Sequence, residues 1–213
     1  MGRATSPGGA AACLSSVSDS QARLTIANRG LPEVEVLKNG QGNAEIVLTL
    51  LRCVGWLSRD DLSTRTGHAG PPSVETPGAQ MPGRWEFDYS IIPGLDDISA
   101  FREAFSFEAP LRAVGTNLHH GTLPARLSFV SVEPAEFQVT AIKQVDDGNG
   151  WLVRGVNLTG EEIQVRLTPW KPFKKIEQIN LAETRIASLT AEKDGTVSLP
   201  VKGHTIITVR FMD

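Results

Sequence analysis

Short stretches in which apolar and polar residues alternate recur along this chain, and they constrain its fold more than any other feature. The clearest of them is Trp85–Ile91, where every second residue is aromatic or aliphatic and those between are Glu, Asp and Ser. Side chains of a strand point alternately to opposite faces, so a period of two predicts a strand with one wet face. We therefore expect a mainly all-β protein.

The arrangement of these stretches predicts two antiparallel β-sandwich units. Residues 126–213 hold several short alternating segments separated by Gly, Asn and Asp turns, which is typical of a sandwich. Residues 20–125 predict a second β unit, and the division falls near residues 122–125. Residues 1–19 are small, Gly-rich and weakly apolar, so we interpret them as a disordered leader rather than a secretory signal.

Three features mark the first unit. Residues 45–54 form an almost continuous apolar run, which we interpret as a strand covered on both faces. Residues 55–83 lose all periodicity, and a long connection of this kind is more often a functional loop than a random one. One short helix is expected near residues 97–106, capped by Asp97 and ended by Pro110.

Composition excludes several functional classes. The 21 Lys and Arg residues nearly balance the 24 Asp and Glu residues, so no basic surface for nucleic acid or an anionic membrane is expected. No apolar run approaches the roughly 20 residues of a membrane span. The only two cysteines, Cys13 and Cys53, cannot form a disulfide framework and are expected to be free thiols. We expect a cytoplasmic protein.

No standard catalytic or nucleotide-binding motif is present in the sequence. The neighbouring His119 and His120 would point to opposite faces of a strand and are more simply solvated than metal-bound. The two catalytic carboxylates of a glycosidase lie on either side of the scissile bond, and the adjacent residues Asp60 and Asp61 fit this separation poorly. An independent hydrolase that uses Asp60 or Asp61 is therefore the remotest hypothesis. Asn157 begins a glycosylation sequon by letter, but we interpret it as part of a turn.

The long loop is more informative. It carries polar side chains between glycines that permit close approach of a ligand, and such groups on a rigid sheet suit recognition of sugar hydroxyls. Our candidates for these contacts are Asp61, Arg65, His68 and Gln80. A loop packed for structure, with its polar groups satisfied internally, is an equally weighted alternative.

The loop contains the runs Asp61-Leu62, Thr64-Arg65, Gly67–Pro71 and Thr76–Gln80. These runs closely resemble the C-terminal region of glycoside hydrolase family 38 α-mannosidases of bacterial and archaeal type. Further segments that carry the resemblance are 28–33, 48–52, 54–59, Phe87-x-Tyr89, 128–133, 141–143, 147–148, 152–154 and Asn157. Together they cover about residues 20 to 211, nearly the whole chain.

The resemblance implies retaining hydrolysis of α-mannosidic bonds by a part of the enzyme that this sequence lacks. In the family, an N-terminal α/β barrel holds a catalytic zinc and supplies an aspartate nucleophile. We therefore expect no catalytic residue, metal ligand or cofactor in this chain, with zinc in the missing domain. The chain alone should be inactive and should contribute structure and a substrate rim to a mannoside-cleaving enzyme, with Arg65 the best single candidate.

The resemblance also implies that upstream strands are missing from the first unit. An incomplete sandwich exposes an apolar face or an open strand edge, and such surfaces bind partners. We expect the chain to dock onto the catalytic barrel or to self-associate. The alternative hypothesis is a free-standing carbohydrate-binding or protein-interaction module.

Overall fold

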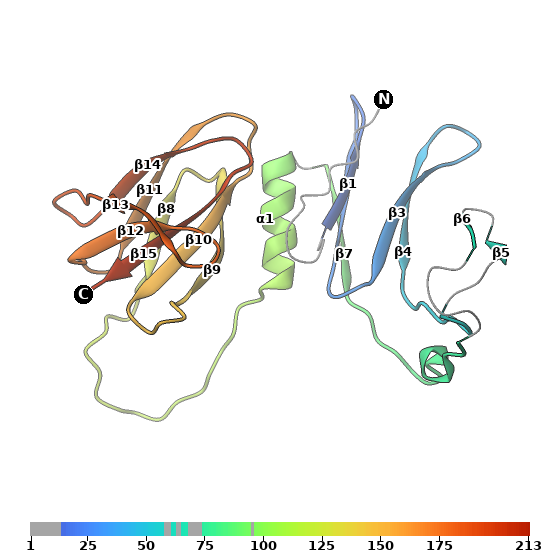
Figure 1. Ribbon diagram of the computed structural model, residues 1–213, viewed down its shortest axis with the longest axis horizontal. Coiled ribbons are helices and arrows are strands. Elements are labelled where there is room, and N and C mark those ends of the chain that lie inside the picture. Colours follow the sequence, from blue (N-terminus) through green and yellow to red (C-terminus); the bar gives the residue numbers. More distant parts are fainter. Residues whose placement is uncertain (1–13, 58–60, 63–64, 68–73, 95) are drawn as a thin grey trace. The chain divides into compact units, whose positions relative to one another are not determined.

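The computed structural model describes residues 14–57, 61–62, 65–67, 74–94 and 96–213. Its contacts divide the chain into two compact units, Met1–Arg112 and Ala113–Asp213. Both are built mainly from antiparallel strands (Figure 1), so the expectation of a mainly all-β chain with one short α-helix is confirmed for the described residues. No helix in this part of the chain has the length and apolar character that crossing a bilayer requires.

The centre of the first unit is a three-stranded antiparallel sheet in the order β1-β2-β7. Its strands are β1 (Leu14–Ser18), β2 (Arg23–Asn28) and β7 (Tyr89–Pro93). The face that carries the buried residues Leu14, Ala27 and Ile92 packs against the helix α1 (Asp97–Glu108). On β7 the alternate residues Tyr89 and Ile91 point to the opposite face and are exposed.

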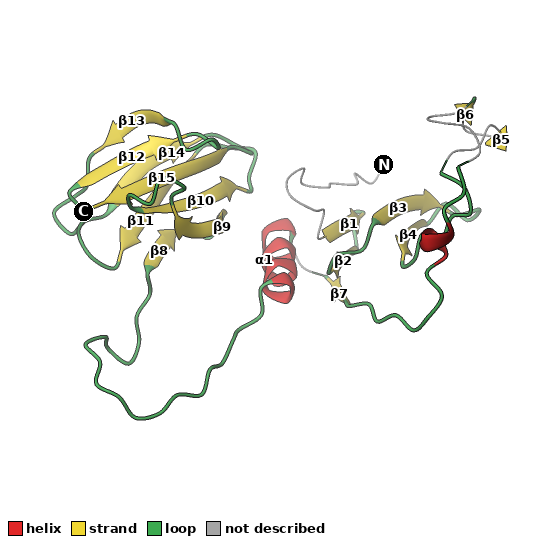
Figure 2. Ribbon diagram, turned by 60° about the horizontal axis from the view of Figure 1, so that its bottom comes forward, coloured by secondary structure: helices red, strands yellow, loops and turns green. Residues whose placement is uncertain are grey.

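Figure 2 shows the helix α1 in red. Asp96 caps the N-terminus of this helix. The Asp96 carboxylate accepts hydrogen bonds from the backbone N–H groups of Ile98 and Ser99, both at 3.0 Å. These groups have no partner inside the helix, so the cap satisfies them. The capping residue is thus Asp96, not Asp97 as the sequence suggested, and the helix continues to Glu108.

The remaining strands of the first unit form small, separate pairs. β3 (Glu33–Lys38) and β4 (Ala44–Thr49) make a hairpin, and β5 (Asp61–Leu62) pairs with β6 (Arg65–Thr66). A short 3-10 helix, η1 (Pro77–Gln80), follows. No sheet in the described part of this unit exceeds three strands, which agrees with the incomplete sandwich expected from the sequence.

The second unit is a sandwich of two antiparallel sheets (Figure 2). One sheet has the order β13-β12-β15-β10-β9 and the other β14-β11-β8. The strands are β8 (Val130–Glu133), β9 (Phe137–Gln144), β10 (Trp151–Asn157), β11 (Ile163–Pro169), β12 (Lys175–Ile179), β13 (Arg185–Leu189), β14 (Val197–Val201) and β15 (Ile206–Met212). The core lies between the sheets, because buried residues of both, such as Leu167 and Val209, form one cluster.

The structure corrects several expectations in the first unit. Leu14–Ser18 is strand β1 and not part of a disordered leader, because it pairs with β2; the expectation for residues 1–13 lies outside the described residues. The apolar run 45–54 is no strand covered on both faces. Its strand ends at Thr49 and pairs only with β3. Residues 50–54 belong to no strand and are exposed.

The strand expected over Trp85–Ile91 begins only at Tyr89. Its partner β2 ends at Asn28, opposite Tyr89, and the chain then turns at Gly30, which has a positive φ of 75°. Residues 85–88 therefore pair with no strand. Asp88 is still bound to Arg29, whose amide donates to the Asp88 carbonyl (3.1 Å) and whose guanidinium donates to the Asp88 carboxylate (3.2 Å).

Candidate functional site

The structure places the four expected rim residues in different ways. Asp61 and Arg65 lie on the paired strands β5 and β6, where Asp61 is opposite Thr66 and Leu62 is opposite Arg65. His68 lies outside the described residues. Gln80 ends η1, and its Nε2 donates a hydrogen bond of 2.7 Å to the Val54 carbonyl. Its amide therefore supports the loop, which agrees with the structural alternative for this residue.

The two ends of the loop form a short two-stranded ribbon, made of residues 54–57 and 74–76, which we call the Trp56 ribbon. Trp56 lies opposite Glu75 in an antiparallel bridge. On either side of this bridge, the Leu57 amide donates to the Val74 carbonyl (2.9 Å) and the Thr76 amide to the Gly55 carbonyl (3.0 Å). The ribbon thus has a defined register.

Side chains strengthen the ribbon at its base. The Thr76 hydroxyl donates to the Val54 carbonyl at 2.8 Å, and this same oxygen accepts the hydrogen bond from Gln80. A carbonyl oxygen has two lone pairs, so both bonds can form together. The polar groups of Thr76 and Gln80 consequently hold the ribbon against η1.

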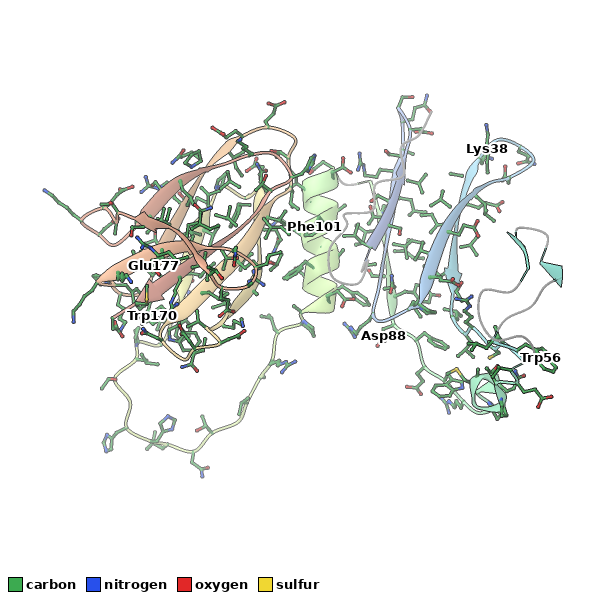
Figure 3. All side chains as sticks on the ribbon, in the orientation of Figure 1. Lys38, Trp56, Asp88, Phe101, Trp170 and Glu177 are labelled. Atoms are coloured by element: carbon green, nitrogen blue, oxygen red, sulfur yellow. The ribbon has the colours of Figure 1, made fainter. Side chains whose placement is uncertain are left out.

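A shallow open depression of ≈ 190 Å³ lies at this junction. Its lining residues are Gly55, Trp56, Glu75, Thr76, Pro77 and Gln80. Figure 3 shows Trp56 beside η1. The depression combines an exposed indole with a carboxylate, a hydroxyl and an amide. This combination can stack an apolar ring face and hydrogen-bond its polar edges.

A second tryptophan follows η1. The indole Nε1 of Trp85 donates to the Met81 carbonyl at 2.9 Å, and this bond fixes the orientation of its ring. Met81 has a positive φ of 45°, which ends η1 in a left-handed conformation. Like Trp56, Trp85 is exposed.

Sequence reasoning missed these tryptophans as site residues. The alternation of Trp85–Ile91 predicts a strand there, and Trp56 enters only as part of segment 54–59, which carries the family resemblance. The available signal was that two of the four tryptophans in the chain lie in or beside a segment without periodicity. Large aromatic residues outside regular elements are candidates for surface contacts.

Among the described residues, the histidines lie outside this depression. His119 lies in an exposed segment, and its Nδ1 contacts the Asn117 carbonyl at 2.7 Å. His204 has a positive φ of 54° and begins the turn into β15. Among the described residues, no three His, Cys, Asp or Glu side chains come together as possible metal ligands.

The carboxyl groups with a lowered pKa serve turns and caps rather than the Trp56 ribbon. The backbone N–H of Asn149 is the main cause that lowers the pKa of Asp147, and the backbone N–H of Ser99 does the same for Asp96. A hydrogen bond from Lys143 lowers the pKa of Glu183. Structural networks perturb pKa values as catalytic sites do, and these are of the structural kind.

Comparison with known proteins connects the fold to a family. The family model described as the glycosyl hydrolases family 38 C-terminal beta sandwich domain matches residues 136–209, which lie in the second unit. No curated protein sequence matches the chain.

Two solved structures extend the similarity to the first unit. One is a protein in glycosyl hydrolase family 38 from Enterococcus faecalis, and the other is an α-mannosidase from Enterococcus faecalis V583. Each is 28% identical to this chain and covers 93% of it, with a TM-score of 0.73. The chain spans only 22% and 20% of these two proteins.

The sequence-based resemblance is thereby confirmed: the chain resembles the C-terminal β region of the glycoside hydrolase family 38 α-mannosidases.

Proposed function

We propose that this chain supplies the C-terminal structural and substrate-rim β region of an α-mannosidase and is inactive alone. The observation that carries the proposal is the unequal coverage in the structural match. Nearly the whole chain, 93%, corresponds to about a fifth of a family 38 protein. In those relatives the same fold is one part of a much longer polypeptide. We infer that the remaining part hydrolyses the α-mannosidic bond.

The chemistry belongs to that remaining part. The resemblance implies a zinc-dependent barrel, and the residues described here bring no three potential ligands together, so they do not fit the ion. We therefore assign no step through zinc to this chain. The cytoplasmic location expected from the sequence remains part of the proposal.

The contribution of this chain is to position groups at the rim. Asp61, Arg65 and His68 all fall between the two arms of the Trp56 ribbon in the sequence. The backbone hydrogen bonds of the ribbon join residues 55–57 to residues 74–76, on either side of this segment. We propose that these side chains contact the mannoside or the carboxylates that surround it.

The test is co-expression with the Enterococcus faecalis α-mannosidase from which the segment matching this chain has been removed. We expect the co-purified pair to release nitrophenol from 4-nitrophenyl α-mannoside in the presence of zinc. The chain purified alone should release none under the same conditions. Activity of the chain alone, or failure of the two parts to associate, would overturn the proposal.

The depression beside Trp56 favours a second candidate function, a free-standing carbohydrate-binding module. An exposed indole beside Glu75 and Thr76 is a suitable platform for a sugar ring. Affinity electrophoresis in gels that contain mannan tests this function directly. Retardation of the wild-type chain that is lost in Trp56→Ala would support it, whereas equal mobility of both would remove it.

A further inference from the structure

The turn between β9 and β10 contains one of the two Asn-Gly pairs of the chain, Asn149-Gly150, and the other is Asn39-Gly40 at the tip of the β3–β4 hairpin. In such a pair the backbone nitrogen of the glycine can attack the side-chain carbonyl carbon of the asparagine, because glycine has no Cβ that hinders the approach. The reaction is intramolecular, so its rate depends on how freely the two atoms can meet. The structure makes the two pairs unequal in this respect.

The side-chain amide of Asn39 is held by three hydrogen bonds. Its Nδ2 donates to Oε1 of Glu45 at 3.0 Å, and its Oδ1 accepts from the backbone N–H groups of Gln41 and Asn43 at 3.0 and 2.9 Å. Rotation of this side chain toward the nitrogen of Gly40 would break these bonds together. The fold therefore protects the first pair.

The side-chain amide of Asn149 is exposed and makes no hydrogen bond to any residue that the structure describes. The backbone N–H of Gly150 likewise has no acceptor within the described ranges. Asp147 accepts the backbone N–H of Asn149, and Arg210 donates to its backbone carbonyl. Both bonds leave the side chain free to rotate, so the attacking nitrogen and the carbon it attacks are both available.

The turn requires a glycine at the attacking position. Gly150 has a positive φ of 106°, which side chains rarely tolerate. A Cβ atom there would also collide with the backbone carbonyl of Phe211 and lie 3.0 Å from Cγ of Met212. The close approach of β10 to β15 therefore demands the one residue that makes the preceding Asn149 reactive.

We propose that Asn149 is a site of spontaneous deamidation and that its modification detaches the turn from the sheet. The Gly150 nitrogen loses its proton and forms a bond to Cγ of Asn149, and the side-chain nitrogen leaves as ammonia. Water then opens the cyclic imide that results. Cleavage of the new bond to Cγ gives aspartate, whereas cleavage at the backbone carbonyl gives isoaspartate, in which the main chain runs through the former side chain.

Isoaspartate at position 149 is incompatible with the contacts of the turn. The carbonyl of Asn149 accepts hydrogen bonds from Nε and Nη2 of Arg210 at 3.1 and 2.7 Å. In isoaspartate this carbonyl becomes part of a free carboxylate, and the main chain leading to Gly150 is longer by a methylene group. The Gly150 carbonyl, which accepts from the amide of the buried Val145 at 3.1 Å, must then shift. The second unit should consequently lose stability.

The experiment ages the purified chain in mildly alkaline buffer at physiological temperature. Trypsin then releases the two pairs in separate peptides, residues 39–52 and 144–154. Mass spectrometry detects the replacement of the amide by a hydroxyl group, and chromatography separates the aspartate peptide from the isoaspartate peptide. We expect Asn149 to react at least about tenfold faster than Asn39. In the chain unfolded by guanidinium chloride the two rates should agree within about threefold, because only the fold distinguishes the pairs.

Two variants connect the modification to stability. Asn149→Ala removes the reactive side chain without removing a hydrogen bond, so ageing should lower the urea midpoint of the wild type and leave that of this variant unchanged. Asn149→Asp, measured directly after purification, carries the new charge without the longer main chain. Its urea midpoint should equal that of the fresh wild-type chain.

Three results would contradict the proposal. If Asn39 reacted as fast as Asn149 in the folded chain, the free side chain would confer no advantage. If ageing lowered the urea midpoints of the wild type and Asn149→Ala equally, the modification would not loosen the turn. If fresh Asn149→Asp already had the lowered midpoint, the charge and not the longer main chain would be responsible.

Discussion

The guanidinium group of Arg210 holds the carboxylate of Asp147 with both oxygens, from Nη2 at 3.0 Å to Oδ1 and 2.8 Å to Oδ2. Arg210 lies on β15 and is only 9% exposed, whereas Asp147 lies in the turn between β9 and β10. The same guanidinium also donates to the Asn149 carbonyl. The turn is thereby attached to the sheet.

This attachment predicts a loss of stability in acid. The backbone N–H of Asn149, and secondarily Arg210, hold the pKa of Asp147 below its ordinary value of 3.8. A lowered pKa in the folded state stabilises the fold fully above the ordinary value, and the contribution is lost as the pH falls through the folded-state value. We expect the urea midpoint to fall between about pH 6 and about pH 3, and to fall less in Asp147→Asn.

Asp146→Asn is the control for this prediction, since it removes a carboxylate from the same turn whose partner is Lys143 instead of Arg210. It should retain most of the wild-type difference between the two pH values. If the urea midpoint of Asp147→Asn depended on pH as strongly as that of the wild type, the loss of stability in acid could not be attributed to Asp147.

The buried side-chain amide of Asn157 should contribute strongly to the stability of the second unit. Its side chain is fully buried, and Nδ2 donates to the carbonyls of Glu161, Val201 and Lys202 at 2.7, 3.0 and 3.2 Å. Removal takes this donor from the buried bond to Val201 and from the part-buried bonds to Glu161 and Lys202, so Asn157→Ala should lower the free energy of unfolding by about 2 to 3 kcal/mol. Urea titration followed by circular dichroism measures this change.

Two further variants sharpen the test of Asn157. Asn157→Asp keeps the shape but replaces the donor by an acceptor, so it should destabilise at least as much as alanine does. Asn149→Ala removes an exposed asparagine of the same unit and should change the free energy of unfolding by less than about 0.5 kcal/mol. Equal effects of Asn157→Ala and Asn149→Ala would show that the buried amide contributes nothing special.

Any side chain added at Gly155 on β10 should overpack the surrounding structure. A Cβ atom at this position would collide with the ring of Phe137 and lie 2.7 Å from the Gln138 carbonyl oxygen. The neighbouring strand cannot move without disturbing the bulge between Arg154 and Gly155. Gly155→Ala should therefore cost about 3 kcal/mol of stability. In Gly160→Ala the new Cβ has an ordinary contact of 3.7 Å with His204, and its unfolding midpoint should equal that of the wild type.

The second unit shows why part of the fold could be predicted from the sequence. The strand β11 alternates because one face of its sheet packs on a closed core, and the alternation is visible in the sequence. The strand β14 is harder to predict, although Val197, Leu199 and Val201 alternate and are buried. Pro200 argues against a strand, but β14 lies at the edge of its sheet, where proline is tolerated.

The first unit shows why the rest could not be predicted. An apolar run such as 45–54 indicates a covered strand only if partners for both faces exist within the same chain. Here the ladder stops at Thr49, and the exposed residues that follow lead into the Trp56 ribbon. The sequence contains the apolar side chains, but it does not state whether they are covered by this chain or by another part of an enzyme.

A substitution of Arg65 tests the proposed substrate rim directly. It lies on β6, opposite Leu62 of β5, in the loop that the Trp56 ribbon supports. A guanidinium group can hold a sugar hydroxyl or a carboxylate through two parallel hydrogen bonds, which an ammonium group cannot reproduce. In the assembled enzyme, Arg65→Ala should lower kcat/KM for 4-nitrophenyl α-mannoside at least about tenfold, through a higher KM or a lower kcat. Arg65→Lys should not restore it, and Arg102→Ala, which removes an exposed arginine from α1, should leave both constants unchanged. Wild-type kinetics in Arg65→Ala would remove this residue from the rim.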